Sequence, residues 1–164
     1  MYRFLNQDLD DLNIYVLNMN QEEKKKSARG NLIYVTGIAI LHIAAGFLNQ
    51  PSSRTFYVVY PYLIVFLPLI YAFLGVVTYY SATTRMSGRQ YREGIQRIRR
   101  SLLGIMVLKV IGMLLDIVYL IRNFYQGFME MEIIYLAFHI LVIFGIILYG
   151  RYYDKTFTNI QIES

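Results

Sequence analysis

Four long runs of apolar residues constrain this chain more than any other feature of its sequence. They cover residues 32–48, 57–80, 102–121 and 133–149. A helix needs about 20 mainly apolar residues to cross the hydrocarbon core of a bilayer, with a range of about 17 to 25. The runs are continuous, whereas strands of a transmembrane barrel alternate in polarity over segments of about ten residues. We therefore predict an all-α integral membrane protein, in which a bundle of four transmembrane helices forms a single domain.

The third run is the least apolar of the four, because it contains Lys109 and Asp116. A charged side chain at the centre of a membrane helix costs about 2.5–3.5 kcal/mol on the insertion scale, and the Leu, Ile and Val residues around it offset roughly that amount. An alternative topology therefore has three crossings and a helix on the membrane surface. The distribution of basic residues favours four crossings.

Basic residues alternate in abundance from one connecting segment to the next. The segment 1–31, the segment 81–101 and the tail after residue 149 hold most of them, whereas the other two connections hold only Arg54 and Arg122. Lys and Arg accumulate on the cytoplasmic side of membrane proteins. We therefore predict that both termini and the middle segment are cytoplasmic, which requires an even number of crossings.

The amino-terminal segment carries apolar residues at helical spacing. Leu5, Leu9, Leu12 and Val16 recur every three or four positions, with acidic residues elsewhere on the turn. This pattern predicts a short amphipathic helix over residues 2–20. We favour a helix that caps the bundle or lies on the membrane surface. The alternative is a helix that docks a partner protein.

The middle segment, residues 81–101, predicts a basic amphipathic helix that continues into the third crossing. Tyr91, Ile95, Ile98 and Leu102 lie on one helical face. The basic positions are Arg85, Arg89, Arg92, Arg97, Arg99 and Arg100. We favour contact with anionic lipid headgroups over an acidic protein partner, and we expect no nucleic acid, because topology already accounts for the net charge of +5.

Ionisable residues inside the crossings are the candidates for a functional site. His42, Lys109, Asp116 and His139 lie within the apolar runs. Helix geometry places Asp116 and His139 at similar depth and His42 nearer the midplane, so His139 is the first candidate partner of Asp116 and His42 the second. A proton- or ion-linked site is one interpretation, since intramembrane charges are functional hypotheses by default. The other, which the sequence alone favours, is that these side chains hold the helices together through hydrogen bonds.

The second run contains Pro61 and Pro68, seven residues apart. Proline removes a backbone donor and often kinks a membrane helix. A kink near Pro68 either opens space for a ligand or a gating motion, or is part of fixed packing, which we favour.

Several chemistries are missing from the sequence. The chain has no cysteine, which excludes disulfides, thiolate metal sites and cysteine nucleophiles. It also lacks zinc-protease, phosphate-loop, nucleophile-elbow and dinucleotide-binding motifs. Two histidines cannot complete a three-ligand zinc site without a further ligand such as Asp116. We therefore expect no cofactor and no metal.

These observations predict a small, non-enzymatic subunit of a membrane assembly for transport, secretion or defence. It would be a multi-pass protein of a bacterial-type cytoplasmic membrane, surrounded by anionic lipid and assembled with itself or with another membrane protein. Two alternatives stay open. One is an oligomeric channel or proton- or ion-linked transporter that uses the intramembrane charges, and the other is a membrane enzyme acting on a lipid-soluble substrate.

Overall fold

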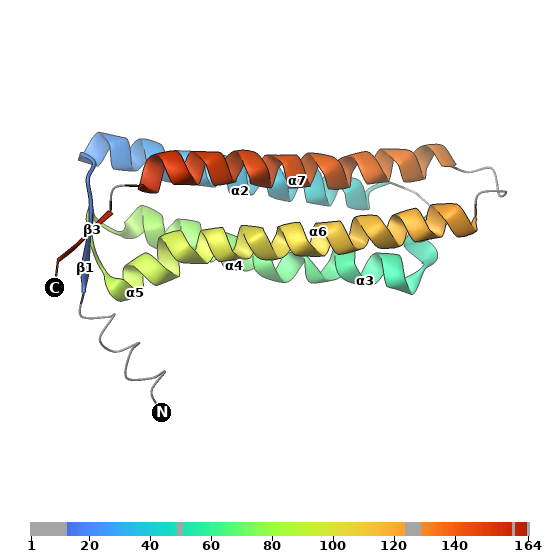
Figure 1. Cartoon of the computed structure of the whole chain (residues 1–164), viewed down its shortest axis with the longest axis horizontal. Coiled ribbons are helices and arrows are strands. Elements are labelled where there is room, and N and C mark those ends of the chain that lie inside the picture. The colour runs from blue at the N-terminus through green and yellow to red at the C-terminus, as the bar shows by residue number, and fades with distance from the viewer. Residues whose placement is uncertain (1–12, 49–50, 124–128, 159, 164) are drawn as a thin grey trace, which may run out of the picture.

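A computed structural model describes residues 13–48, 51–123, 129–158 and 160–163. The chain is mostly helical, and its long helices lie side by side along the long axis of the molecule (Figure 1). Four helical segments are long and apolar enough to cross a membrane: Gln21–Gly46, Phe56–Ser81, Gly88–Arg122 and Glu130–Phe157. This confirms the predicted four-helix arrangement. Each segment begins before the apolar run from which it was predicted, and all but the first, which ends at Gly46, also extend past its end.

The helices and strands follow one another in a simple order. In chain order they are β1 (Ile14–Leu17), α2 (Gln21–Gly46), the 3₁₀ turn η1 (Pro51–Arg54), α3 (Phe56–Ile64), α4 (Phe66–Ser81), β2 (Arg85–Ser87), α5 (Gly88–Tyr91), the π-helical turn η2 (Arg92–Gln96), α6 (Arg97–Arg122), α7 (Met129–Phe157) and β3 (Ile160–Glu163).

The strands β1, β2 and β3 form a small antiparallel sheet at one end of the bundle (Figure 1). β1 is the central strand: Tyr15 is opposite Met86 of β2 and opposite Ile162 of β3. We call this end the sheet end, and the opposite end, which carries η1, the loop end. The sheet brings the start of α2, the end of α7 and the middle segment together at one end of the bundle.

The sheet corrects two sequence predictions. Val16 lies in a β-strand, so the amphipathic helix predicted for residues 2–20 does not continue through this part of the chain. The rest of that helix, with Leu5, Leu9 and Leu12, lies outside the described residues. The all-α assignment also needs correction, because the fold includes a small sheet whose first strand is the β-branched and aromatic run from Ile14.

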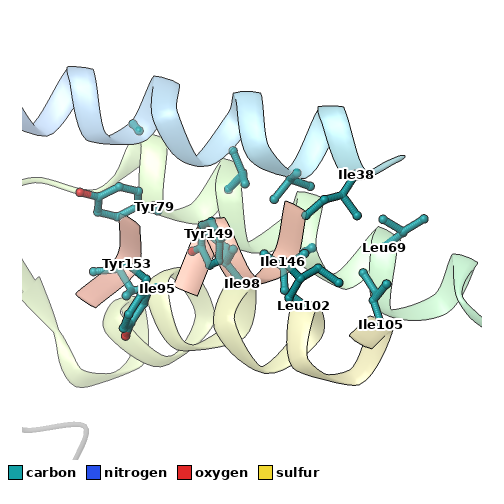
Figure 2. Packing of buried hydrophobic residues seen from close by; sticks show 14 of the residues in the cluster. Ile38, Leu69, Tyr79, Ile95, Ile98, Leu102, Ile105, Ile146, Tyr149 and Tyr153 are labelled. Carbon is teal, nitrogen blue, oxygen red and sulfur yellow. The ribbon is translucent and has the colours of Figure 1, made fainter. Parts of the chain in front are cut away.

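The core runs along the axis of the bundle between all four helices (Figure 2). Ile38, Leu69, Ile98 and Ile146 are each at most 4% exposed and come from α2, α4, α6 and α7. The outward faces are apolar as well, and Ile33 remains 70% exposed. A helix that is apolar all round suits a membrane, where hydrocarbon rather than water covers the outer face.

The second crossing is interrupted where the sequence predicts a kink. α3 ends at Ile64 and α4 begins at Phe66, with Pro61 and Pro68 on either side of the break. Because Pro68 has no backbone N–H, it cannot bond to the carbonyl of Ile64, four residues earlier. The break therefore has a direct cause in the sequence.

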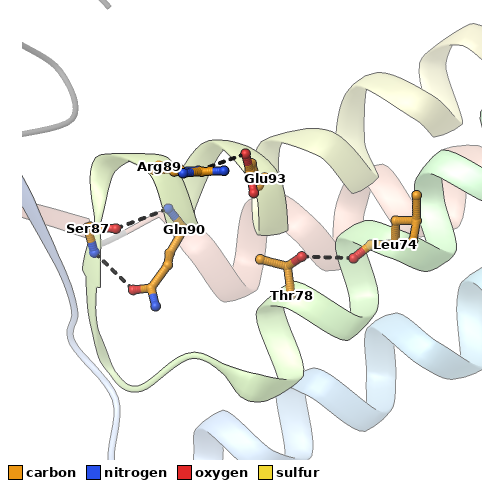
Figure 3. A network of polar contacts seen from close by, with 6 residues as sticks. All are labelled: Leu74, Thr78, Ser87, Arg89, Gln90 and Glu93. Carbon is orange, nitrogen blue, oxygen red and sulfur yellow. Dashed lines mark hydrogen bonds and ion pairs between the residues drawn. The ribbon is translucent and has the colours of Figure 1, made fainter. Parts of the chain in front are cut away.

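The middle segment is largely helical, as predicted, but the strand β2 precedes its helical part. Ser87 caps α5: its hydroxyl accepts a hydrogen bond from the backbone N–H of Gln90, and the Gln90 side chain accepts one from the N–H of Ser87 (Figure 3). Arg89 forms an ion pair with Glu93 one turn later. The helix then passes through η2, where Gly94 packs directly against the backbone of Tyr79 in α4. This close approach sets the spacing of the two helices.

Candidate functional site

The four ionisable residues predicted within the crossings are all buried inside the bundle. His42 comes from α2, Lys109 and Asp116 from α6, and His139 from α7, and each is at most 3% exposed. We call these four side chains the interior site. Charged residues in soluble cores are rarely this buried without a partner, and in a bilayer their burial is costly.

The imidazole of His139 packs against Gly112 of α6, which lies between Lys109 and Asp116 in the sequence. A Cβ atom built on Gly112 would lie 2.9 Å from Nε2 of His139, so the imidazole occupies the space that a larger residue at position 112 would fill. Gly112 lies three residues after Lys109 and four before Asp116, which is about 4.5 Å and about 6 Å along the helix axis. The three side chains therefore succeed one another along α6.

Lys109 and the two histidines form the basic part of the interior site. His42 lies within electrostatic reach of both Lys109 and His139. The ring of Tyr62 in α3 packs against this group: its centroid is 4.4 Å from that of His42 and 5.8 Å from Nζ of Lys109. An aromatic face within about 6 Å attracts an ammonium group, and more strongly where water is excluded.

Asp116 lies near a second carboxyl group that sequence reasoning did not include among the principal candidates. Glu132, at the start of α7, is 1% exposed and accepts two hydrogen bonds of 2.7 Å from Ser52, one from its backbone N–H and one from its hydroxyl. Asp116 lies beside both Glu132 and Ser52. The acidic part of the site therefore lies at the loop end, where Glu132 anchors η1 to α7.

Most polar atoms of the interior site have no hydrogen-bond partner among the described residues. These atoms are Nδ1 and Nε2 of His42, Nζ of Lys109, both carboxylate oxygens of Asp116 and Nδ1 of His139. The expected hydrogen bond between Asp116 and His139 is therefore not formed. None of the side-chain nitrogen and oxygen atoms of His42, Lys109 and Asp116 has such a partner, so no two members of the site form a hydrogen bond with each other. Hydrogen bonds within the site therefore do not hold the helices together.

A second set of buried polar side chains, at the sheet end, does form hydrogen bonds. The hydroxyls of Ser27 and Tyr79 are 2.6 Å apart, and the hydroxyl of Tyr149 donates to the Asn31 side chain at 2.9 Å. Lys24 donates from Nζ to the backbone carbonyls of Tyr80 and Ala82. These bonds join α2 to α4 and α7. Sequence reasoning missed this network, although Lys24, Ser27 and Asn31 recur every three or four residues on one helical face.

The arginines of the middle segment interact with side chains of their own helical segment and of other elements. Arg85 pairs with Glu163 of β3 at 2.5 Å, and Arg89 with Glu93 at 3.1 Å. Arg97 lies over the ring of Tyr71, Arg99 lies over the ring of Tyr153, and Arg100 donates to Gln96. Arg92 is half-buried. These arginines therefore interact within the chain, while the side chains of Arg85 and Arg89 stay 66% and 73% exposed.

The chemistry available in the interior site is that of ionisable groups in a low-dielectric environment. The described residues contain no group of three or more His, Asp or Glu side chains that could hold a metal ion. Imidazole, ammonium and carboxyl groups in sequence along a helix can hold and pass protons, and imidazole suits this role because in water it titrates near neutral pH. Comparison with family models, with curated proteins and with solved structures finds no match for this chain.

Proposed function

We propose that this chain is a multi-pass membrane protein that conducts protons, or an ion linked to protons, through the interior site. One observation carries the proposal: His139 lies opposite Gly112, whose position along α6 is between those of Lys109 and Asp116. Six polar atoms of this site have no hydrogen-bond partner among the described residues. Buried polar atoms without partners cost free energy and normally persist only for a reason such as function. The absence of hydrogen bonds between these side chains weakens the structural interpretation that the sequence alone favoured.

The proposed orientation follows from charge. The basic sheet end would face the cytoplasm and the loop end the outside, as in a bacterial-type cytoplasmic membrane. A proton entering from outside would then meet Glu132 and Asp116 first, then His139, and Lys109 last.

Proton flux through proteoliposomes tests this proposal directly. The protein is reconstituted with a pH-sensitive dye inside the vesicles, and a potassium gradient with valinomycin drives proton entry. We expect flux in the unmodified protein and at least a tenfold loss in Asp116→Asn and in His139→Gln.

Thr78→Val is the matched control. The hydroxyl of Thr78 bonds to the carbonyl of Leu74 in its own helix, near the sheet end of α4 and away from the interior site (Figure 3). This variant should retain full flux. Size-exclusion chromatography establishes that each variant is folded. Unchanged flux in folded Asp116→Asn contradicts the proposal.

A second candidate, which the sequence favoured, is a non-enzymatic subunit of a larger membrane assembly. The observation in its favour is the edge strand β3, where Ile162 is 60% exposed and whose outer edge pairs with no described strand. Such an edge can pair with a strand from a partner. Native mass spectrometry in mild detergent distinguishes a stable hetero-complex from a homo-oligomer. If the arginines also dock a partner, neutralising Arg89, Arg92 and Arg99 releases it, and retained co-purification counts against that role.

A further inference from the structure

A pocket of about 180 Å³ opens on the surface of the loop-end half of the bundle. It lies between the end of α2, η1, α3 and α7. Val58, Val59 and Leu63 of α3 form its apolar walls, and Tyr62 and Tyr135 form its inner wall. Gly46 and Leu63 at its rim are exposed, so the opening faces the surroundings of the bundle.

The two tyrosines separate this pocket from the interior site. Tyr62 packs against His42 with its ring and against Gly46 with its hydroxyl. The ring centroid of Tyr135 is 4.7 Å from that of His139. Tyr135 also interacts electrostatically with Asp116, Glu132 and Tyr62. A molecule in the pocket would therefore contact two side chains that themselves contact the site.

We propose that this pocket binds a small, uncharged, single-ring molecule with a hydrogen-bonding oxygen, such as a phenol. The size argument is direct, because an apolar cavity of about 150 Å³ is sufficient for benzene. The apolar walls favour a ring, whereas a charged group would lose its hydration without a paired charge in the wall. The tyrosine hydroxyls offer partners for one oxygen. Since the pocket opens between membrane-spanning helices, the ligand reaches it from the lipid. This inference goes beyond the proposed function, because binding does not depend on proton conduction.

Fluorine NMR of 4-fluorophenol with the full chain in lipid nanodiscs tests the pocket. We expect saturable broadening of the ligand signal that unlabelled phenol reverses. Leu63→Trp fills the pocket and should abolish the saturable component. Leu67→Trp is the matched control, because Leu67 is an equally lipid-facing leucine, 63% exposed, one turn further along the crossing and outside the pocket. Equal saturable binding by these two variants, or none by the unmodified protein, overturns the proposal.

Removal of single hydroxyls tests the chemical class of the ligand. Tyr62→Phe and Tyr135→Phe preserve the ring contacts and should keep the fold. At least one of them should weaken 4-fluorophenol binding by about two- to tenfold, the range for one hydrogen bond. Fluorobenzene, which has no hydroxyl, should bind both variants as it binds the unmodified protein. Unchanged 4-fluorophenol affinity in both variants overturns the hydrogen-bonding requirement. All binding is measured in symmetrical buffer, so the result is independent of proton flux.

Discussion

Two groups of buried polar residues in the same bundle contrast at the level of single atoms. At the sheet end, Asn31 and Tyr149 bond to each other and Lys24 bonds to backbone carbonyls. In the interior site, Lys109 and Asp116 have no hydrogen-bond partner among the described residues. A satisfied network stabilises a fold, whereas unsatisfied polar atoms destabilise it. The first group therefore stabilises the bundle, and the second costs stability.

Gly112→Ala tests whether a glycine is required for the position of His139. The added Cβ would lie 2.9 Å from Nε2, so the imidazole must move. Overpacking costs about 1–3 kcal/mol, so we expect the free energy of unfolding of Gly112→Ala to lie about that far below that of a Gly-to-Ala change without a clash, measured by SDS titration in mixed micelles. Gly150→Ala is the control, because a Cβ atom added there meets no neighbouring side chain within 4 Å, and it should be neutral or slightly stabilising. Equal stability of the two variants would show that the contact is relaxed at no cost.

The same unfolding measurement applies to the contact between Ser52 and Glu132. Ser52→Ala removes one of the two donors to the carboxylate, and Glu132→Gln removes its charge. We expect a double-mutant coupling energy of about 1.5–3 kcal/mol, the range for a hydrogen bond to a charged group. A coupling near zero would mean that η1 is not anchored by this pair.

At the scale of elements, the helices are positioned by their ends as much as by their apolar faces. α4 ends at Ser81, and the carbonyls of Tyr80 and Ala82 near its end accept bonds from Lys24 of α2. A cation near a helix carboxyl terminus also interacts favourably with the helix dipole. Lys24 is only 4% exposed, so this cap joins two crossings in the core.

Lys24→Met should remove that cap while preserving the length of the side chain. We expect the free energy of unfolding to fall by about 1–3 kcal/mol, because two buried carbonyls lose a charged donor. Lys25→Met provides the comparison, since Lys25 is exposed on the same helix turn and should change stability by less than about 0.5 kcal/mol. Similar stability of the two methionine variants would exclude a capping role.

At the scale of the whole molecule, the sheet draws distant parts of the chain to one end. β1 pairs with β2, which precedes the third crossing, and with β3, which follows the fourth. The ion pair between Arg85 and Glu163 links the two edge strands across β1. The sheet end is therefore one structural unit made from three separate segments.

Cysteine labelling tests which side of the membrane this unit faces. The chain has no cysteine, so single replacements at the exposed positions Gln161 and Arg54 give clean reporters. A membrane-impermeant maleimide added to intact cells should label Arg54→Cys at the loop end, and should label Gln161→Cys only after permeabilisation. The reverse pattern would invert the proposed orientation, and equal labelling in intact cells would contradict four crossings.

The helices were predictable because the length of an apolar run is a local property, which can be compared directly with the thickness of a bilayer. The inward-facing residues of the middle segment and the break near Pro68 could be predicted for the same reason. The small sheet was not, because strands of three or four residues are stable only when paired with segments far away in the sequence. The composition of the site also required the fold: Ser52 and Glu132 are 80 residues apart, and only packing shows that His139 enters the space at Gly112. The sequence alone therefore determined which segments form helices long and apolar enough to cross a membrane, whereas the tertiary structure decided which polar atoms find partners and which do not.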